Sequence, residues 1–212
     1  AGQKVLISAG GTREPIDPVR FIGNRSSGAM GVALAETAQL LGATVTLVHG
    51  DLEVALPRGV ECVSAPSAQA MHTAMLERFP EATCTLMAAA VADWTVQAAP
   101  EKLSKDESAA WPERTQTVDI AAELGQKKTP EQTLVVFAAE TTADDQELLA
   151  RAVAKREAKG ADVVVANRVG EQVGFGPTET AVWIVQRSGA PVLSTGSKLT
   201  VAGHLFDVLL GP

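Results

Sequence analysis

The chain has 212 residues, of which 46% are hydrophobic and 20% charged, as in ordinary globular proteins. Its net charge of −7 argues against nucleic-acid binding, because a phosphate backbone requires a basic face. It contains no apolar run of about 18 residues and no signal-peptide pattern, so we expect a cytoplasmic protein without a membrane partner. Cys62 and Cys84 fall within apolar, strand-like runs, which indicates free thiols rather than a disulfide framework.

Apolar runs and amphipathic stretches alternate along the chain. Strands are expected at Lys4–Ser8, Thr44–Val48, Val60–Ser64, Thr83–Ala90, Thr133–Ala138 and Asp162–Ala166. Helices are expected at Gly31–Leu41, Ser67–Phe79, Asp119–Lys127, Asp144–Lys159 and Ser197–Leu210. This alternation predicts an α/β fold: a doubly wound, mostly parallel, Rossmann-like sheet with helices on both faces. Thr180–Gln186 and Val192–Thr195 break the rhythm and predict a late antiparallel hairpin. No linker or repeat divides the chain, so residues 1–212 are expected to form a single domain.

The connection between the first strand and the first helix is unusually long. Such connections usually have about 2–6 residues, and a longer one in a compact domain is usually functional. It ends in Ser26-Ser27-Gly28-x-x-Gly31, where the helix begins. Helix N-termini present unpaired N–H groups and partial positive charge, so this segment is a candidate anion site. The alternative is a hydroxyl-capped helix behind an ordinary loop.

Unusual residues follow several predicted strands directly. They are Gly10-Gly11, Ala89 to Asp93, Phe137 to Glu140, and Asn167. In open parallel sheets ligands bind beyond the carboxyl ends of the strands, so these residues predict a functional cleft. The stretch from Val91 to about Gln116 is expected to be irregular.

Other kinds of site fit less well. The Gly-x-Gly-x-x-Gly fingerprint is absent after the first strand, which argues against a nicotinamide-dependent reductase, although Asp51 could contact a ribose. The histidines are scattered and no Gly-x-Ser-x-Gly elbow is present. Lys155 and Lys159 share one helix face, which suits either a phosphate or plain solvent exposure. Arg13, Arg20 and Arg25 add positive charge near the first loop.

Several motifs together resemble one family. The run from Ala9 to Gly31, AGGTREPIDPVRFIGNRSSGAMG, closely resembles the start of phosphopantothenoylcysteine synthetase. Further matches occur in the family's order: Ala89 to Trp94, Pro100 to Lys102, Val136 to Thr141, the Lys155/Lys159 pair, and Ala166-Asn167. The chain is similar to the synthetase half of the bacterial bifunctional decarboxylase/synthetase of coenzyme A biosynthesis.

The resemblance implies a ligase that joins 4′-phosphopantothenate and L-cysteine. The alternatives are a nicotinamide-dependent reductase and a non-catalytic nucleotide-binding domain on a Rossmann-like fold, although a binding domain has no need for a flap lysine. The substrate carboxylate would attack CTP with Mg²⁺, giving an acyl-cytidylate and pyrophosphate, and the cysteine amine would then displace CMP. Mg²⁺ would be bound mainly through the CTP phosphates. The resemblance also implies a homodimer, with residues of about 178–196 as a contact element, and fusion to an N-terminal flavin-dependent decarboxylase.

The resemblance assigns roles to particular residues. Asn24 and Lys102 would be catalytic, Lys102 on a flap of residues about 94–116. The nucleotide would be bound by Met87, Ala88, Ala89, Asp93, Lys102, Asp119, Ile120, Phe137, Lys155 and Lys159. Phosphopantothenate would be bound by Gly11, Asn24, Ser26, Gly28, Gly31, Ala89, Ala90 and Asn167. Thr117-Val118 departs from the family's usual Asn-Pro, which alters part of the expected nucleotide loop.

Overall fold

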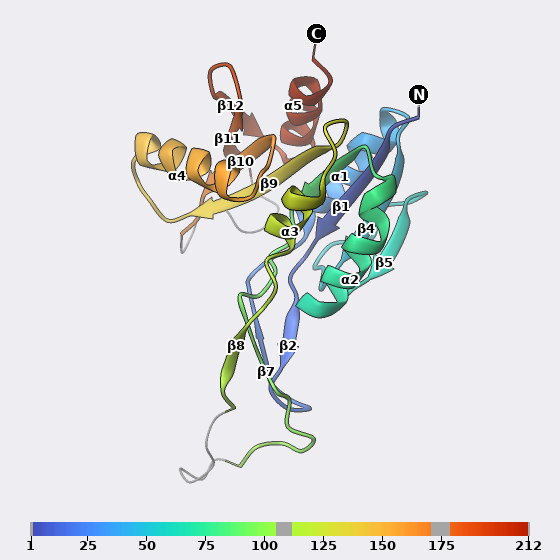
Figure 1. The fold of residues 1–212 in the computed structure, drawn as a ribbon, viewed down its shortest axis with the longest axis vertical. Helices are drawn as coiled ribbons and strands as arrows, with labels where there is room; N and C mark the ends of the chain where they lie inside the picture. The colour runs from blue at the N-terminus through green and yellow to red at the C-terminus, as the bar shows by residue number, and fades with distance from the viewer. Residues whose placement is uncertain (1, 105–111, 171–178, 212) are drawn as a thin grey trace.

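A computed structural model of the protein describes residues 2–104, 112–170 and 179–211. Residues 105–111 of the expected flap and residue 178 of the expected contact element lie outside these ranges. Figure 1 shows a central twisted sheet flanked by helices, with a long arm projecting beyond the strand ends on one side of the sheet. The strands of this sheet follow the order β12-β11-β10-β9-β6-β1-β4-β5 within the described ranges.

The described part of this sheet contains six parallel strands and one antiparallel hairpin. The parallel strands are β1 (Lys4–Ala9), β4 (Thr44–His49), β5 (Glu61–Ser64), β6 (Cys84–Met87), β9 (Thr133–Glu140) and β10 (Val163–Arg168). The hairpin is formed by β11 (Thr180–Gln186) and β12 (Val192–Gly196), which pair antiparallel at the β10 edge. Both the mostly parallel sheet and the late hairpin predicted from the sequence are confirmed.

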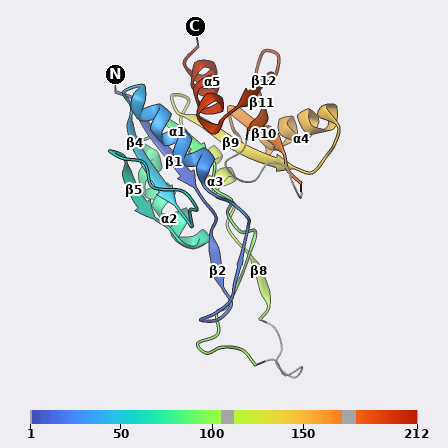
Figure 2. The same ribbon diagram turned by 180° about the vertical axis from the view of Figure 1, so that it is seen from behind.

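Helices cover both faces of the sheet, as predicted. They are α1 (Ala29–Leu40), α2 (Ala68–Arg78), a short 3₁₀ turn η1 (Phe79–Glu81), α3 (Ile120–Lys127), α4 (Asp145–Ala158) and α5 (Lys198–Leu210). Helices α1 and α5 pack on one face, seen in Figure 2, and α2, α3 and α4 pack on the other. Successive strand residues point to opposite faces, so Ile7 joins the first core and Leu6 the second. This double burial explains why the central positions of β1, β9 and β10 are apolar on both faces of the sheet.

Two short antiparallel ribbons form the arm, which we define as residues 13–23, 94–104 and 112–116. Strands β2 (Arg13–Pro15) and β3 (Phe21–Gly23) pair in one ribbon. Strands β7 (Trp94–Val96) and β8 (Arg114–Gln116) pair in the other. The ribbons run side by side away from the sheet in Figures 1 and 2. The prediction of irregular structure from Val91 to about Gln116 missed β7 and β8, because three-residue strands carry too little alternation to be recognised, while the other described residues of that stretch are irregular.

Asp17 joins the two ribbons of the arm. Its buried carboxylate accepts hydrogen bonds from the backbone N–H groups of Val19 and Arg20, both at 2.8 Å, and from Arg20 Nε at 2.8 Å. The backbone N–H of Leu103 also donates to it at 3.2 Å. The Arg20 guanidinium, more than any other group, holds the pKa of Asp17 well below its usual range. This ion pair therefore connects the first loop to the segment that carries Lys102.

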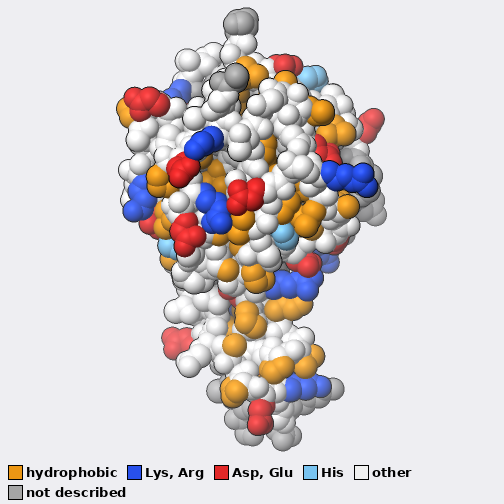
Figure 3. All heavy atoms as spheres, turned by 90° about the vertical axis from the view of Figure 1, so that its right-hand side faces the viewer, with side chains coloured by type: hydrophobic (Ala, Val, Ile, Leu, Met, Phe, Trp, Pro, Cys, Tyr) orange, Lys and Arg blue, Asp and Glu red, His pale blue; other side chains and the backbone are white. Residues whose placement is uncertain are grey.

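Hydrophobic side chains lie on the surface of the arm, as Figure 3 shows below the rounded body. Val19, Phe21 and Trp94 are among the large apolar residues that are exposed. The Arg13 guanidinium stacks over Phe21 at 4.6 Å and also pairs with the Asp51 carboxylate. Asp51, considered above as a ribose ligand, thus anchors the base of the arm to the end of β4.

No helix in the described ranges is long and apolar enough to cross a membrane.

Candidate functional site

A cavity of about 730 Å³ lies at the carboxyl ends of β6, β9 and β10. The chain builds outward from β1 to β4 and β5, then returns to place β6 on the other side of β1. Ligands of doubly wound sheets bind at this reversal of strand order. Most of the predicted site residues line the cavity: Asn24, Ser26, Gly28, Gly31, Met87, Ala88, Ala89, Ala90, Asp93, Asp119, Ile120, Phe137, Lys155, Lys159 and Asn167. Gly11 and Lys102 are not among its lining residues.

The start of α1 forms one wall of the cavity. Gly28 occupies the N-cap position with φ of 73°, a left-handed conformation that favours glycine, and no side chain caps this helix. The two serines before the N-cap accept hydrogen bonds from nearby backbone N–H groups. Ser27 Oγ accepts from the Ala29 N–H at 3.4 Å, and Ser26 Oγ accepts from the Gly28 N–H at 3.3 Å. The alternative of a hydroxyl-capped helix is therefore wrong at the N-cap position, which Gly28 occupies; Ser27 bonds the first N–H of the helix, and this first turn lines the cavity.

Close packing against β1 requires a glycine at position 31. A Cβ atom added at Gly31 would lie 2.4 Å from the Ala9 Cβ and 3.1 Å from the Ala9 Cα. The first turn of α1 therefore rests directly on the end of β1. This close approach fixes the position of the α1 N-terminus relative to the strand ends.

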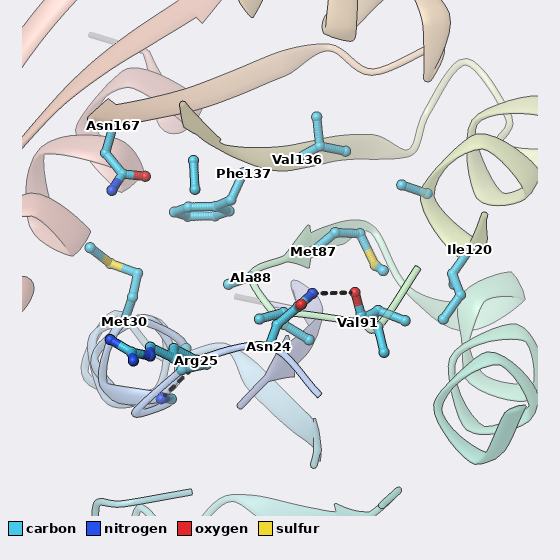
Figure 4. A pocket seen from close by; sticks show the side chains of 18 of the residues that line it. Asn24, Arg25, Met30, Met87, Ala88, Val91, Ile120, Val136, Phe137 and Asn167 are labelled. Atoms are coloured by element: carbon cyan, nitrogen blue, oxygen red, sulfur yellow. Dashed lines mark hydrogen bonds between the residues drawn. The ribbon is translucent and has the colours of Figure 1, made fainter. Parts of the chain in front are cut away.

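Asn24 lies in the middle of the cavity. Figure 4 shows it between Arg25 and Met30, beside α1, and Ile120 on α3. Its Nδ2 donates to the Val91 carbonyl oxygen at 2.9 Å, which orients the amide. Gly11 packs closely against it, since a Cβ there would stand 2.9 Å from the Asn24 backbone oxygen. Gly11 therefore contacts the backbone of Asn24 rather than lining the cavity.

The opposite wall is formed by α3 and α4. Asp119 caps α3, accepting from the Ala122 N–H at 3.0 Å, and its carboxylate pairs with Lys159 Nζ. Burial alone would raise the pKa of Asp119, but the hydrogen bonds from Lys159 and Ala122 bring it below its usual value. Gly125 allows the two helices to meet, because a Cβ there would lie 1.8 Å from the Lys159 carbonyl oxygen. Lys155 lines the same wall.

Asp93 and Thr117 join the arm to the cavity. The Thr117 N–H donates to the Asp93 carbonyl oxygen at 3.1 Å, and the Thr117 hydroxyl donates to the Ala92 carbonyl oxygen at 2.6 Å. The residue that departs from the expected Asn thus ties together two segments of the cavity rim.

Lys102 is exposed on the arm. No cluster of three or more His, Cys, Asp or Glu side chains suited to a metal occurs within the described ranges.

Sequence reasoning missed some residues that line the cavity. They include Met30, Gln116, Val136, Thr180, Val182 and Lys198. Met30 and Val136 lie within the motifs named above but were given no role, and no local pattern marks the others as part of a site. Lys198 lines the cavity only because β12 returns the chain to the end of the sheet where the cavity opens.

This architecture is that of a Rossmann-like α/β protein with a cation-bearing cavity at its switch point, where such proteins bind phosphorylated ligands. Residues 1–211 match the model of the DNA/pantothenate metabolism flavoprotein C-terminal domain, and the chain belongs to this family.

Two curated relatives show the extent of the similarity. The "Coenzyme A biosynthesis bifunctional protein CoaBC" of Mycobacterium bovis is 40% identical over 219 residues, covering 99% of this chain and 52% of that protein. The Bacillus subtilis protein of the same name is 42% identical over 215 residues, covering 98% of this chain and 50% of that protein. The chain thus spans about half the length of either relative.

A solved structure matches the fold closely. The crystal structure of the C-terminal domain of a coenzyme A biosynthesis bifunctional protein CoaBC superposes with a TM-score of 0.81 at 34% identity. The match covers 98% of this chain and 94% of that one. The chain is therefore similar to the C-terminal half of these bifunctional proteins.

Proposed function

We propose that residues 1–212 form a single ligase domain that joins 4′-phosphopantothenate to L-cysteine, with CTP as co-substrate, in coenzyme A biosynthesis. One observation carries the proposal: a single cavity has an uncapped helix start at one wall, a lysine pair at the other, and the Asn24 amide between them. Two anionic substrates can thereby be held with their reacting groups at the middle. The family membership and the bifunctional relatives support the same reaction.

In the first step the phosphopantothenate carboxylate attacks the α-phosphorus of CTP, and the bond to pyrophosphate breaks. Lys155 and Lys159 would bind the nucleotide phosphates, and Asp119 would hold Lys159 in position. Met87, Ala88, Asp93, Ile120 and Phe137 would surround the rest of the nucleotide. Neutralising the triphosphate and aligning the attacking oxygen provide most of the catalysis in reactions of this kind.

In the second step the cysteine amine attacks the acyl carbon, CMP leaves and an amide forms. The Asn24 amide, fixed by its bond to Val91, would hold the acyl group and stabilise charge on its oxygen. Ser26, Gly28, Gly31 and Asn167 would bind the phosphopantothenate phosphate, and Ala89 and Ala90 leave room for the pantothenate arm. Lys102 would approach the reacting phosphate from the arm segment held by Asp17.

Mg²⁺ is proposed to reach the site with the nucleotide. It prefers phosphate oxygens, waters and one or two carboxylates over a cage built entirely from protein. Asp93 is exposed and lines the cavity, so its carboxylate fits this donor set. Bound there, the ion would neutralise charge on the departing pyrophosphate.

We further propose a cytoplasmic homodimer whose full-length form carries an N-terminal flavin-dependent decarboxylase. Both cysteines are free thiols, which suits a reducing compartment, and the two relatives are bifunctional by name. Two exposed apolar surfaces could form the dimer: β12 at the sheet edge, with Leu193 exposed, and the arm, with Phe21 exposed. Light scattering of Leu193→Glu and Phe21→Glu would identify the surface used, because only the variant at the interface should become monomeric.

The activity test measures pyrophosphate release from the purified chain with Mg²⁺, CTP and 4′-phosphopantothenate. Release that requires phosphopantothenate and exceeds release from ATP supports the proposal; absence of release with either nucleotide contradicts it.

Asn24→Asp should still release pyrophosphate but fail to make the amide, and normal amide yield would remove Asn24 from the mechanism. Lys102→Gln should nearly abolish pyrophosphate release. Lys127→Gln, an exposed change on α3 outside the cavity lining, serves as the control and should match the parent.

A further inference from the structure

Lys198 is a cavity residue to which none of the roles above applies. It is the first residue of α5, it lines the cavity and it is half-buried. Its ammonium group has no hydrogen bond or ion pair with any residue in the described ranges. Burial lowers its pKa, as expected for a cation that loses water without gaining a counter-charge. A half-buried cation beside an open cavity is stabilised when an anion occupies the cavity.

The topology places Lys198 on the α1 side of the cavity. Gly196 at the end of β12 pairs with Thr180, and Val182 pairs with Asn167 at the end of β10. Thr180, Val182 and Asn167 all line the cavity together with Lys198. Helices α5 and α1 pack on the same face of the sheet. Lys155 lies in α4 and Lys159 is the C-cap residue of this helix, which packs on the opposite face.

The cavity therefore has separate cationic groups on its two sides. On the α4 side, Lys159 is already paired with Asp119. On the α1 side, the amides of the first turn, of which that of Ala29 already donates to Ser27, carry only a partial positive charge, about half a unit for a whole helix. A phosphate monoester carries nearly two negative charges at neutral pH. Lys198 supplies the full charge that the helix start lacks.

We propose that Lys198 binds the phosphate group of 4′-phosphopantothenate and determines the preference for the phosphorylated substrate over pantothenate. The inference rests on the proposed function, since it concerns the same cavity. Lysine suits this task because it acts as a point charge toward a terminal phosphate, whose oxygens present no fixed plane. Asn167 and the α1 amides would then orient the phosphate, while Lys198 would provide most of the charge neutralisation.

The test compares binding of 4′-phosphopantothenate and of pantothenate by calorimetry in the parent, Lys198→Gln and Lys198→Arg. A charge-assisted hydrogen bond to phosphate corresponds to roughly a 10- to 100-fold change in Kd. We expect Lys198→Gln to weaken phosphopantothenate binding by this factor and to leave pantothenate binding unchanged. Lys198→Arg should recover most of the loss. The KM for CTP should stay constant in both variants.

Matched variants separate this inference from the ligase proposal. Lys155→Gln should show the opposite pattern, with a raised KM for CTP and an unchanged Kd for phosphopantothenate. Lys127→Gln should change neither.

If the parent releases pyrophosphate and Lys198→Gln retains the full preference for phosphopantothenate, the inference fails and the ligase proposal stands. If Lys198→Gln weakens both pantoate-containing ligands equally, Lys198 only supports the cavity wall and the inference also fails. If the parent releases no pyrophosphate, the ligase proposal fails, while the calorimetric comparison still tests Lys198.

Discussion

Gly31→Ala tests how the first turn of α1 is positioned. The added methyl carbon would lie 2.4 Å from the Ala9 Cβ and 3.3 Å from the Ser8 carbonyl oxygen, and both belong to the buried strand β1. Ordinary contact needs at least 3.4 Å, so the helix start must move away from the strand by about 1 Å. Overpacking of this kind costs about 1–3 kcal/mol, against which alanine regains about 0.5–1 kcal/mol of helix propensity.

The expected consequence is a lower melting temperature and a displaced α1 wall. At about 2–4 °C per kcal/mol for a chain of this size, a net loss of about 1–2 kcal/mol lowers Tm by about 2–8 °C. Binding of phosphopantothenate should weaken more than binding of CTP, because the movement affects the α1 side of the cavity.

Gly203→Ala is the matched control for this prediction. Gly203 lies inside α5, and nothing stands within 4 Å of a Cβ built there. The same substitution should therefore raise stability by about 0.5–1 kcal/mol through helix propensity alone. Thermal melts of both variants check the reasoning. An increase in Tm for Gly31→Ala similar to that of Gly203→Ala would refute the close packing of α1 on β1.

Three further changes test other parts of the fold. In Asp17→Asn the stability lost relative to the parent should be largest above about pH 4 and shrink as pH falls through the depressed pKa of Asp17; an acid titration of Tm with a constant gap would contradict this. Ser67→Ala removes the cap whose Oγ accepts from the Ala70 N–H at 3.2 Å, and should cost about 1 kcal/mol by denaturant titration. Cys84, whose pKa burial raises to about 12, should be alkylated much more slowly in folded than in unfolded protein, as mass spectrometry would show.

Much of the sheet could be predicted because its strands carry a strong local signal. β1 and β9 each contain a run of consecutive apolar residues, Val5–Ile7 and Leu134–Ala139. The helices begin and end at recognisable residues, such as the Ser67 cap of α2 and Gly42 after α1 with φ of 85°. The position of the cavity could be predicted because the carboxyl ends of parallel strands lie on the same side of the sheet. The residues that follow β6 and β10 do line this cavity. The predicted strand Thr83–Ala90 ended too late, since β6 stops at Met87 and Ala90 instead forms an isolated bridge with Gly11.

The remaining features depend on contacts between distant segments. The β8 ribbon is polar and fully exposed, so its pairing with β7 leaves no alternation in the sequence. Lys198 is an unremarkable first residue of a helix until the β11–β12 hairpin returns it to the cavity. Asp17 resembles a turn residue, and only the folded arm brings the Leu103 N–H to its carboxylate. These positions were set by tertiary structure rather than by local pattern.

The central claim is that the substrate carboxylate attacks the α-phosphorus of CTP, and one measurement tests it directly. 4′-Phosphopantothenate labelled with heavy oxygen in its carboxylate is incubated with the chain, Mg²⁺, CTP and cysteine, and the nucleotide product is analysed by mass spectrometry. We expect one carboxylate oxygen in the phosphate of CMP, because that oxygen bridges the two groups in the acyl-cytidylate. Amide formation with unlabelled CMP, or with label in inorganic phosphate, would contradict the account.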